Sequence, residues 1–481
     1  MRVLHVASEL YPLVKTGGLG DVLAALPPAL HARGIDARLL LPGFPAIRGG
    51  IAGLQPVAEI GPAFGASFAS VLCGRVPGSG VPAYVIDAPG LYDRPGNPYL
   101  GPDGRDWPDN FRRFALLGWA AAQAAEGLLG DWRPEIVHGH DWHAGLAAAY
   151  LAAAGRRAAS VVTVHNLAFQ GLFPPAVLPE LRLPPHFFAI DGIEFYGQVS
   201  FMKAGLFFAD RITTVSPTYA EEIRRPEHGA GLDGLLRARG AALRGILNGV
   251  DYAIWNPAAD PNLPRPYDRD DPSGKALAKA ALQAELGLAP RPEAPLFGAV
   301  TRLTQQKGFD LVLAALPEIA ALGGQLALLG SGDADLEDGF RDLARRLPQE
   351  VGVRIGYDEA LAHRIVGGAD SILVPSRFEP CGLTQMYALR YGSPPLVRRT
   401  GGLADTVVDA NERTLRDGIA TGFVFETPDA PSFLAAARRA MALYAAPDAW
   451  AALGRQAMAQ RFGWDEAAAR YAALYRELAP G

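Results

Sequence analysis

The sequence is poor in the features that mark secreted, membrane-spanning or nucleic-acid-binding proteins. Only two of its 481 residues are cysteines, so no disulfide framework holds it together and a reducing compartment is expected. Its longest apolar stretch, residues 114–129, contains Gln123 and Glu126 and is too short to cross a bilayer. The net charge of −5 gives no reason to expect nucleic acid or a membrane as partner. The first apolar run breaks at Ser8 and Glu9, so we expect no signal peptide and predict a cytoplasmic protein.

Lysine is scarce as well, since only five of the 45 basic residues are lysines. Two of them, Lys15 and Lys307, stand beside glycines at predicted strand-to-helix turns. Lysine offers a compact ammonium on a flexible stem, which arginine does not replace at a phosphate that requires that geometry. The pattern favours an anion site, and the alternative is that both are ordinary solvated lysines.

Neither of two common nucleotide-binding fingerprints occurs in its usual context after a strand. The P-loop pattern G-x-x-x-x-G-K-[ST] does not occur, and Gly330-Ser331-Gly332 lacks the third glycine of G-x-G-x-x-G. The one G-x-G-x-x-G match, from Gly229 to Gly234, does not directly follow a predicted strand, as the NAD-type fingerprint requires. Neither an NAD-type site nor a P-loop is therefore predicted.

The sequence does have an alternation of short apolar strands and helices, and this alternation occurs once in each half of the chain. This pattern is typical of parallel sheets covered on both faces, and the length suits two domains. Proline- and aspartate-rich residues 257–272 separate the halves, and we place the domain change just before them, at residues 245–248. The predicted strands are residues 3–7, 37–41, 83–87, 136–138, 161–164 and 212–215, then 296–301, 325–329, 353–355, 371–374, 395–397 and 422–425.

A Gly-Gly turn recurs in both halves. Thr16-Gly17-Gly18-Leu19 follows the first strand, and Thr400-Gly401-Gly402-Leu403 follows residues 395–397. Such a turn at a helix start exposes backbone N–H groups to anions and allows close ligand approach. The recurrence indicates two similar halves facing one cleft, or else a coincidence in a chain with 55 glycines.

Two turns of the second half carry charged side chains. Arg302 and Lys307 share one strand-to-helix loop and can neutralise a diphosphate, including the charge that develops on a leaving diphosphate. Glu379 precedes a proline and the amides of Gly382, Leu383 and Thr384, so its carboxylate can accept sugar hydroxyls while the amides face an anion. Solvated charge and a helix-dipole partner are the alternatives.

Histidines cluster in His138-Gly139-His140-Asp141-Trp142-His143. A zinc hydrolase would need the aspartate one position later, so we favour polar ligand contacts at a strand end over metal ligation. His165-Asn166 ends the next predicted strand and can serve the same pocket, unless His165 is merely structural.

Together these motifs closely resemble the bacterial glycogen synthase and plant starch synthase family. The resemblance runs from Met1 to the C-terminal helices and also includes Ser8-Glu9-Leu10-Tyr11-Pro12 and Asn248-Gly249-Val250-Asp251. It implies two Rossmann-like α/β domains facing a deep cleft (GT-B), with a C-terminal helix returning to the N-terminal domain. It also implies retaining transfer of glucose from ADP-glucose to the non-reducing end of glycogen or a malto-oligosaccharide, with no metal or cofactor.

The resemblance also assigns roles. It implies an acceptor-side domain at residues 1–244, a nucleotide-sugar domain at 245–461 and the returning helix at 462–481. Lys15, Arg302 and Lys307 would hold the donor phosphates, with Gly18 in close approach. Asp141, His143, His165 and Asn166 would line the glucose pocket, and Glu379 would bind glucose hydroxyls. The amides of Gly382, Leu383 and Thr384 would meet phosphate and sugar, and Tyr357 would stack on adenine with Asn248 nearby.

Retention ordinarily calls for a carboxylate nucleophile, and the motifs offer no second carboxylate to partner Glu379. We therefore favour front-face attack, in which the leaving phosphate accepts the acceptor's proton. A UDP-glucose transferase, a metallohydrolase and a silent glucan-binding protein are the rival interpretations.

Overall fold

The computed structural model describes residues 1–479 and divides into two compact units. Unit 1 contains Met1–Gly249 and the chain from Trp464 onward, and unit 2 contains Val250–Gly463. The sequence placed the first boundary at residue 245. The structure places it after Gly249, because β12 (Leu243–Gly245) still pairs in parallel with β11 (Arg211–Thr214) of unit 1.

Unit 1 is built on a nine-stranded sheet in the order β12-β11-β7-β6-β1-β2-β5-β4-β3. The strands from β12 to β5 pair in parallel, which confirms the α/β prediction. Their apolar runs are buried on both faces, as parallel strands under helices require. The remaining strands of this sheet are β1 (Arg2–Val6), β2 (Asp36–Pro42), β3 (Ala52–Glu59), β4 (Ser70–Arg75), β5 (Pro82–Asp87), β6 (Ile136–His140) and β7 (Ala159–Val164).

Neither edge of this sheet was predicted, since β12 at one end and β3 and β4 at the other are not among the expected strands. β3 and β4 form an antiparallel hairpin, and β4 also runs antiparallel to β5. β3 is mostly exposed and contains Pro56, so it has neither the apolar run nor the alternation that marks a strand. Its pairing partner, rather than its own sequence, makes it a strand.

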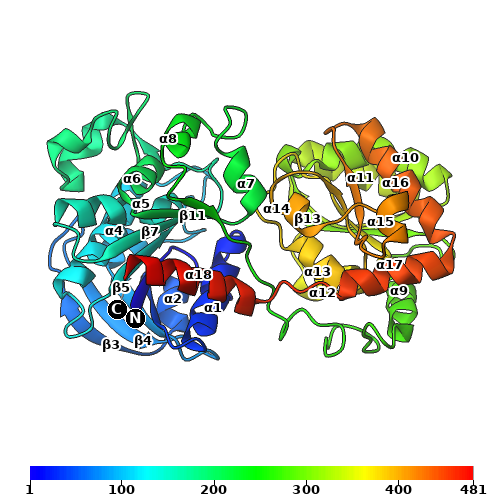
Figure 1. The fold of residues 1–481 in the computed structure, drawn as a ribbon, viewed down its shortest axis with the longest axis horizontal. Coiled ribbons are helices and arrows are strands. Elements are labelled where there is room, and N and C mark those ends of the chain that lie inside the picture. The colour runs from blue at the N-terminus through cyan, green and yellow to red at the C-terminus, as the bar shows by residue number, and fades with distance from the viewer. Residues whose placement is uncertain (480–481) are drawn as a thin grey trace. The chain divides into compact units, whose positions relative to one another are not determined.

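The helices of unit 1 form separate layers. α5 packs against both α4 and α6, while α1 packs against α18, drawn in red in Figure 1. A small antiparallel sheet, β8-β10-β9, lies between α5 and α6 in the chain. The elements are α1 (Gly18–His31), α2 (Pro45–Gly50), α3 (Pro89–Tyr92), α4 (Asn110–Glu126), α5 (Asp141–Ala153), β8 (Leu172–Phe173), η1 (Pro175–Leu181), η2 (Pro185–Phe187), β9 (Glu194–Phe195), β10 (Gln198–Ser200), α6 (Phe201–Phe208), α7 (Pro217–Glu222), α8 (Asp233–Ala238) and α18 (Trp464–Leu478).

The last helix, α18, belongs to unit 1 although it follows unit 2 in sequence, as predicted for the returning helix. Its buried Tyr475 hydroxyl lies 2.6 Å from His138 Nδ1 of β6, and Glu477 pairs with Arg244 of β12. These contacts fix the helix across the sheet.

Unit 2 is a six-stranded, wholly parallel sheet in the order β15-β14-β13-β16-β17-β18. Every strand was predicted within a few residues. The elements are α9 (Ser273–Glu285), β13 (Leu296–Leu303), η3 (Gln305–Lys307), α10 (Phe309–Ala321), β14 (Gln325–Gly332), α11 (Ala334–Arg346), β15 (Val351–Ile355), α12 (Glu359–Gly368), β16 (Ser371–Val374), α13 (Thr384–Arg390), β17 (Leu396–Arg398), α14 (Gly401–Thr406), α15 (Glu412–Arg416), β18 (Phe423–Phe425), α16 (Ala430–Tyr444) and α17 (Pro447–Met458).

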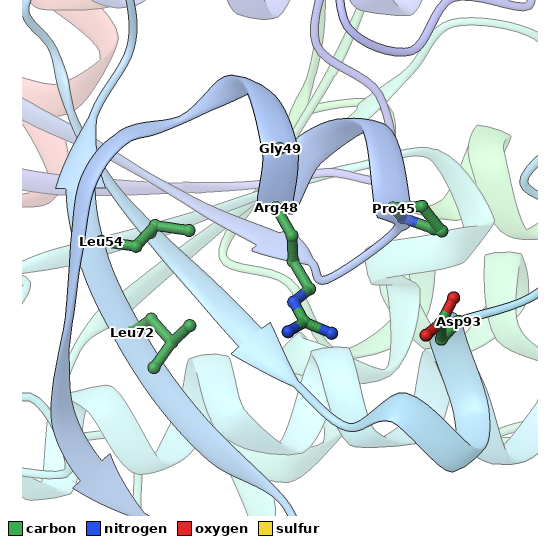
Figure 2. A pocket seen from close by; sticks show the side chains of 6 residues that line it. All are labelled: Pro45, Arg48, Gly49, Leu54, Leu72 and Asp93. Atoms are coloured by element: carbon green, nitrogen blue, oxygen red, sulfur yellow. The ribbon is translucent and has the colours of Figure 1, made fainter.

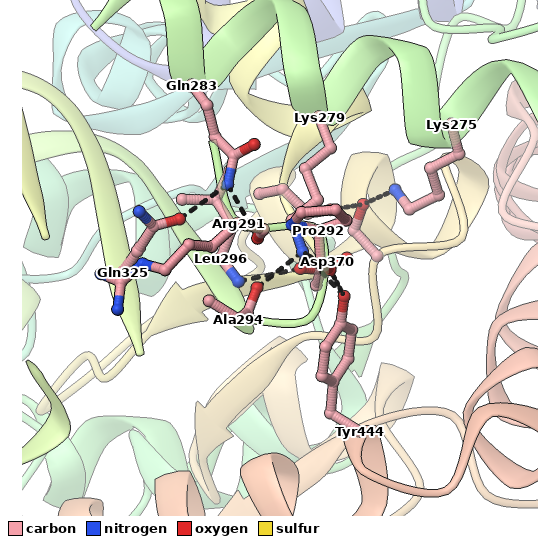
Figure 3. Close-up of polar contacts among 12 residues, drawn as sticks. Lys275, Lys279, Gln283, Arg291, Pro292, Ala294, Leu296, Gln325, Asp370 and Tyr444 are labelled. Atoms are coloured by element: carbon pink, nitrogen blue, oxygen red, sulfur yellow. Dashed lines mark hydrogen bonds and ion pairs between the residues drawn. The ribbon is translucent and has the colours of Figure 1, made fainter. Parts of the chain in front are cut away.

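A buried polar cluster ties α9 to this sheet (Figure 3). Lys279 Nζ lies 2.7 Å from Asp370 Oδ2, and it donates to the carbonyls of Pro292 and Ala294 and to the Tyr444 hydroxyl. Both charged side chains are nearly buried, at 7% and 11% exposure. The cluster therefore satisfies carbonyls that a long loop would otherwise leave unpaired.

Among the described residues, no helix has the combination of length and apolar character needed to cross a bilayer.

Candidate active site

The predicted site residues are divided between the two units, and each half is described by itself. Most of them follow the carboxyl ends of the parallel strands, where ligands bind in such sheets, and Arg302 lies in the last residues of β13. Unit 1 holds Lys15, Gly18, Asp141, His143, His165, Asn166 and Asn248. Unit 2 holds Arg302, Lys307, Tyr357, Glu379, Gly382, Leu383 and Thr384.

A buried carboxylate shapes the glycine loop of unit 1. Glu9 accepts hydrogen bonds from the Thr16 amide at 2.8 Å, the Thr16 hydroxyl at 2.5 Å and the Gly17 amide at 3.4 Å. The Tyr99 hydroxyl donates at 2.6 Å to Oε1, the oxygen that also accepts the Thr16 hydroxyl, and Glu9 is 2% exposed. The sequence analysis names Glu9 only as part of a family motif and gives it no role, and it does not name Tyr99. No local signal marks Tyr99, because it lies in a glycine- and proline-rich loop.

This loop presents Lys15 and Gly18 at the surface. Lys15 Nζ lies 2.8 Å from Asp21 Oδ1, with the two side chains 35% and 21% exposed. A Cβ built on Gly17 meets nothing within 4 Å, so the turn has open space beside it. An exposed ammonium beside an open glycine turn suits the predicted anion.

Asp141 joins the ends of two strands. It is the first residue of α5, in the left-handed conformation at φ 55° that aspartate tolerates. Its Oδ1 accepts from the amides of His165, at 2.7 Å, and Asn166, at 3.3 Å. Burial raises the pKa of the Asp141 carboxyl to about 7, although these amides oppose the shift. The carboxylate thus brings together three residues predicted for one pocket.

His143, two residues after Asp141, is stacked on Tyr99 with ring centroids 4.5 Å apart. Burial lowers the pKa of His143 to about 3, so the ring is neutral at physiological pH. Its Nδ1 is buried and has no hydrogen-bond partner among the described residues. A buried nitrogen of this kind suits a ligand hydroxyl.

A ladder of histidines crosses the centre of the sheet. His5 Nδ1 lies 3.0 Å from His140 Nε2, and His140 Nδ1 lies 3.0 Å from His165 Nε2. His138 stacks on His140 at 4.3 Å. Burial holds the pKa of each of these rings below its ordinary value. His5 was missed, because a histidine in an apolar strand gives no sign of its cross-strand partners.

Nitrogens of His5, His138 and His140 all lie within 4.8 Å of one another, a spacing that permits a shared metal ion. However, His138 is hydrogen bonded through Nδ1 to Tyr475 and through Nε2 to Thr163, both at 2.6 Å. Both nitrogens of His140 are also occupied by other rings. Metal binding would require these bonds to break, so the geometry favours a hydrogen-bonded network.

In unit 2 the structure brings Lys307 and Glu379 together. Lys307, at the end of η3, lies 2.6 Å through Nζ from Glu379 Oε2, and the Ser376 hydroxyl donates to the same oxygen at 2.8 Å. The two side chains are 18% and 10% exposed. A cation and an anion predicted for one donor are thus in direct contact.

The second Gly-Gly turn supports this carboxylate. A Cβ on Gly401, at φ 43°, would lie 2.0 Å from the Glu379 carbonyl oxygen, and one on Gly402 would lie 2.0 Å from that of Cys381. The Gly402 amide donates to the Glu379 carbonyl at 3.1 Å. These glycines are required for close backbone packing, whereas Gly17 faces open space.

The other predicted residues of unit 2 lie on separate elements. Arg302 is exposed on β13, and Tyr357 follows β15 with 79% of its surface exposed. Gly382, Leu383 and Thr384 form the start of α13, where the first amides have no intrahelical acceptor. Asn248 is 5% exposed in unit 1, and its Oδ1 is buried with no partner among the described residues.

A hollow of about 440 Å³ in unit 1 includes none of the predicted residues. Figure 2 shows the Arg48 guanidinium between Leu72 and Asp93 in this hollow. Arg48 also pairs with Asp87 at 3.3 Å. The candidate active site is therefore distinct from this pocket.

Two family models together match most of the chain. The starch synthase catalytic domain matches residues 2–238, and the group 1 glycosyl transferases match residues 287–457. The chain is 56% identical to a glycogen synthase of Albidiferax ferrireducens, over 100% of both chains. It is 57% identical to one of Yersinia enterocolitica, covering 99% of this chain and 100% of that one.

Solved structures agree in fold. The catalytic domain of starch synthase IV from Arabidopsis thaliana, bound to ADP and acarbose, is 34% identical with a TM-score of 0.89, covering 100% of this chain and 99% of that one. A sucrose-phosphate synthase from Thermosynechococcus elongatus shares the fold, with a TM-score of 0.58 at 18% identity, covering 99% of this chain and 98% of that one. With its two α/β units, the chain has the GT-B fold and belongs to the glycogen synthase and starch synthase family of glucosyltransferases.

Proposed function

We propose that this chain transfers glucose from ADP-glucose to the non-reducing end of an α-1,4-glucan, with retention of configuration and release of ADP. The observation that carries the proposal is the similarity, over the whole chain, to a starch synthase domain that holds ADP and acarbose. ADP is the product of the proposed reaction. The glycogen synthases that match the full chain support glycogen as the acceptor.

In this proposal the two ammonium groups bind the donor diphosphate. Lys15 and Lys307 lie on flexible stems beside glycine turns, and Arg302 is exposed on β13 near Lys307 in the chain. As the bond from the anomeric carbon to the phosphate oxygen breaks, negative charge develops on ADP, and these cations stabilise it. The amides of Gly382, Leu383 and Thr384 add donors without net charge.

In the proposal, the glucose of the donor is held by hydrogen bonds between its hydroxyls and polar side chains of the site. We assign its hydroxyls to His143, His165, Asn166, Asp141 and Glu379. Neutral imidazoles suit this role, because a cation would repel the positive charge that develops at the anomeric carbon. The acceptor hydroxyl forms the new bond on the face from which ADP leaves and passes its proton to a phosphate oxygen, so no second carboxylate is needed.

The remaining assignments are the base, the domain roles and the location. Tyr357 stacks on adenine and Asn248 contributes a polar contact. Unit 1 carries the acceptor side, and unit 2, Val250–Gly463, carries the nucleotide-sugar side. The protein works in the cytoplasm, in keeping with its two free cysteines, Cys73 and Cys381.

The proposal is tested by measuring ADP release from ADP-glucose with and without glycogen. We expect glycogen-dependent release and much slower turnover of UDP-glucose. Faster turnover of UDP-glucose would contradict the donor assignment, and glucan binding without ADP release would favour a silent binding protein. Stoichiometric zinc in the purified protein, with loss of activity in a chelator, would favour the metallohydrolase.

A further inference from the structure

We propose that Glu379, through its hold on Lys307, makes the site discriminate against free ADP in favour of ADP-glucose. The inference rests on the proposed function and adds a role in selecting between substrate and product. It starts from the contact between the predicted phosphate ligand Lys307 and the predicted sugar ligand Glu379.

The pair is well protected. Lys307 Nζ lies 2.6 Å from Glu379 Oε2, and the side chains are 18% and 10% exposed. Ion pairs that water reaches poorly are screened less than surface pairs, so each partner strongly affects the other's remaining interactions. Besides Lys307, the Ser376 hydroxyl donates to this same oxygen at 2.8 Å.

The backbone around the pair is held in place by several bonds. Arg377 forms two hydrogen bonds with Asp310, at 2.6 and 2.7 Å, which join the Glu379 loop to the start of α10. The Arg377 amide donates to the Gln306 carbonyl at 2.8 Å. Glu379 therefore stays where it is, and the flexible stem of Lys307 is the part that can turn toward a phosphate.

A diphosphate that binds Lys307 takes the ammonium away from Glu379 or shares it. In either case a second anion comes close to a nearly buried carboxylate, and the two repel each other. ADP-glucose offsets this cost, because its glucose hydroxyls donate to the carboxylate. Free ADP brings no such donor, so the product binds more weakly and leaves more readily.

The corresponding pair of unit 1 differs in one respect. Lys15 pairs with Asp21 at 2.8 Å, with 35% and 21% exposure, but Asp21 is not among the residues predicted to bind the sugar. Only the Lys307 pair joins a predicted phosphate ligand to a predicted sugar ligand. The coupling is therefore assigned to Glu379.

The test is calorimetric titration of the full chain with ADP, ADP-glucose and inorganic pyrophosphate. We expect Glu379→Gln to bind ADP and pyrophosphate more tightly by about fivefold or more, above the effect of an exposed pair. The same variant should bind ADP-glucose more weakly. Glu318→Gln is the matched control, because it removes one charge from an exposed pair with Arg438 and should leave all three affinities unchanged.

A second variant predicts the opposite sign. Ser376→Ala removes a donor from Glu379 and makes the carboxylate depend more on Lys307, so ADP and pyrophosphate should bind more weakly. This variant keeps the test valid if Glu379→Gln fails to fold, as judged by its melting temperature. Lys307→Met combined with Glu379→Gln should lose the gain in pyrophosphate affinity.

Unchanged or weaker binding of ADP and pyrophosphate by folded Glu379→Gln would overturn the inference, while normal glucose transfer by the wild type left the proposed function intact. Pyrophosphate has no base, so its result does not depend on which nucleotide the enzyme uses. A wild type that binds neither ADP nor ADP-glucose would overturn both.

Discussion

Unit 1 should lose stability steeply in mild acid because it buries neutral histidines. Burial lowers the pKa of His5, His143 and His165 to about 3, against 6.5 in the unfolded chain. Below pH 6.5 these histidines therefore become protonated in the unfolded chain but stay neutral in the folded state. Stability from these groups is fully present above pH 6.5 and is lost as the pH falls toward 3.

The size of the effect follows from these values. Between pH 7 and pH 5, each of the three histidines costs the folded state about 2 kcal/mol, or about 6 kcal/mol together. Asp141, with its pKa raised to about 7, takes up a proton in the folded state over the same range and returns about 2 kcal/mol. The net loss, between about 3 and 4 kcal/mol, is a large part of the roughly 5–15 kcal/mol that stabilises a domain. His138 and His140, whose pKa values are also lowered, act in the same direction as the other histidines.

Hydrogen exchange measured by mass spectrometry reports this loss for unit 1 alone. Peptides covering β1, β6 and β7 should lose protection at pH 5 relative to pH 7, after correction for the intrinsic exchange rate. His5→Leu removes one buried ring and should reduce the pH dependence by about 2 kcal/mol, which is about 30-fold in protection. His186→Gln replaces an exposed histidine and should leave the pH dependence unchanged.

Equal protection at the two pH values would refute the reasoning. So would a His5→Leu variant with the pH dependence of the wild type, because the ring would then not be the group that excludes the proton.

Three further changes test other parts of the structure. Lys15→Gln or Lys307→Gln should lower kcat/KM for ADP-glucose at least tenfold, about 1.4 kcal/mol, and arginine should rescue only in part; wild-type kinetics in both Gln variants would refute the diphosphate assignment. Glu9→Gln puts an amide N–H against the donors of Thr16 and should speed hydrogen exchange in residues 10–20; unchanged exchange there would mean that Glu9 does not hold the loop. Lys279→Met leaves Asp370 buried without its ammonium and should cost about 3–5 kcal/mol in chemical denaturation; adding Asp370→Asn should recover most of it, and no recovery would show that the loss comes from packing.

The sequence alone was enough for the central strands of both large sheets, but not for β12 at one edge of the nine-stranded sheet or for β3 and β4 at the other. Buried parallel strands are short runs of apolar residues, and this local signal exists before any tertiary contact. The family resemblance implies a returning helix at residues 462–481, and α18 occupies Trp464–Leu478 within that range. The hairpin of β3 and β4 was missed, since an exposed edge strand with Pro56 has no pattern of its own.

The predicted site residues came partly from chemistry-bearing residue types at strand-to-helix turns and partly, as for Tyr357 and Asn248, from the family resemblance. The scarcity of lysine proved informative in another way. Lys203 donates to the carbonyls of Ile190 and Glu194, and Lys275 donates to those of Gly367 and Tyr391. Lysine is used here to satisfy carbonyls inside the fold, where a compact ammonium fits more readily than a planar guanidinium.

Only the tertiary structure decided which of these residues touch. Glu379 and Lys307 are 72 positions apart, and His5 and His140 are 135 apart, so no local pattern links them. The two Gly-Gly turns read alike in sequence, yet one faces open space and the other packs against the backbone of Glu379. Close packing and burial set these differences, because the partner of a side chain and the water around it depend on strand order and loop placement.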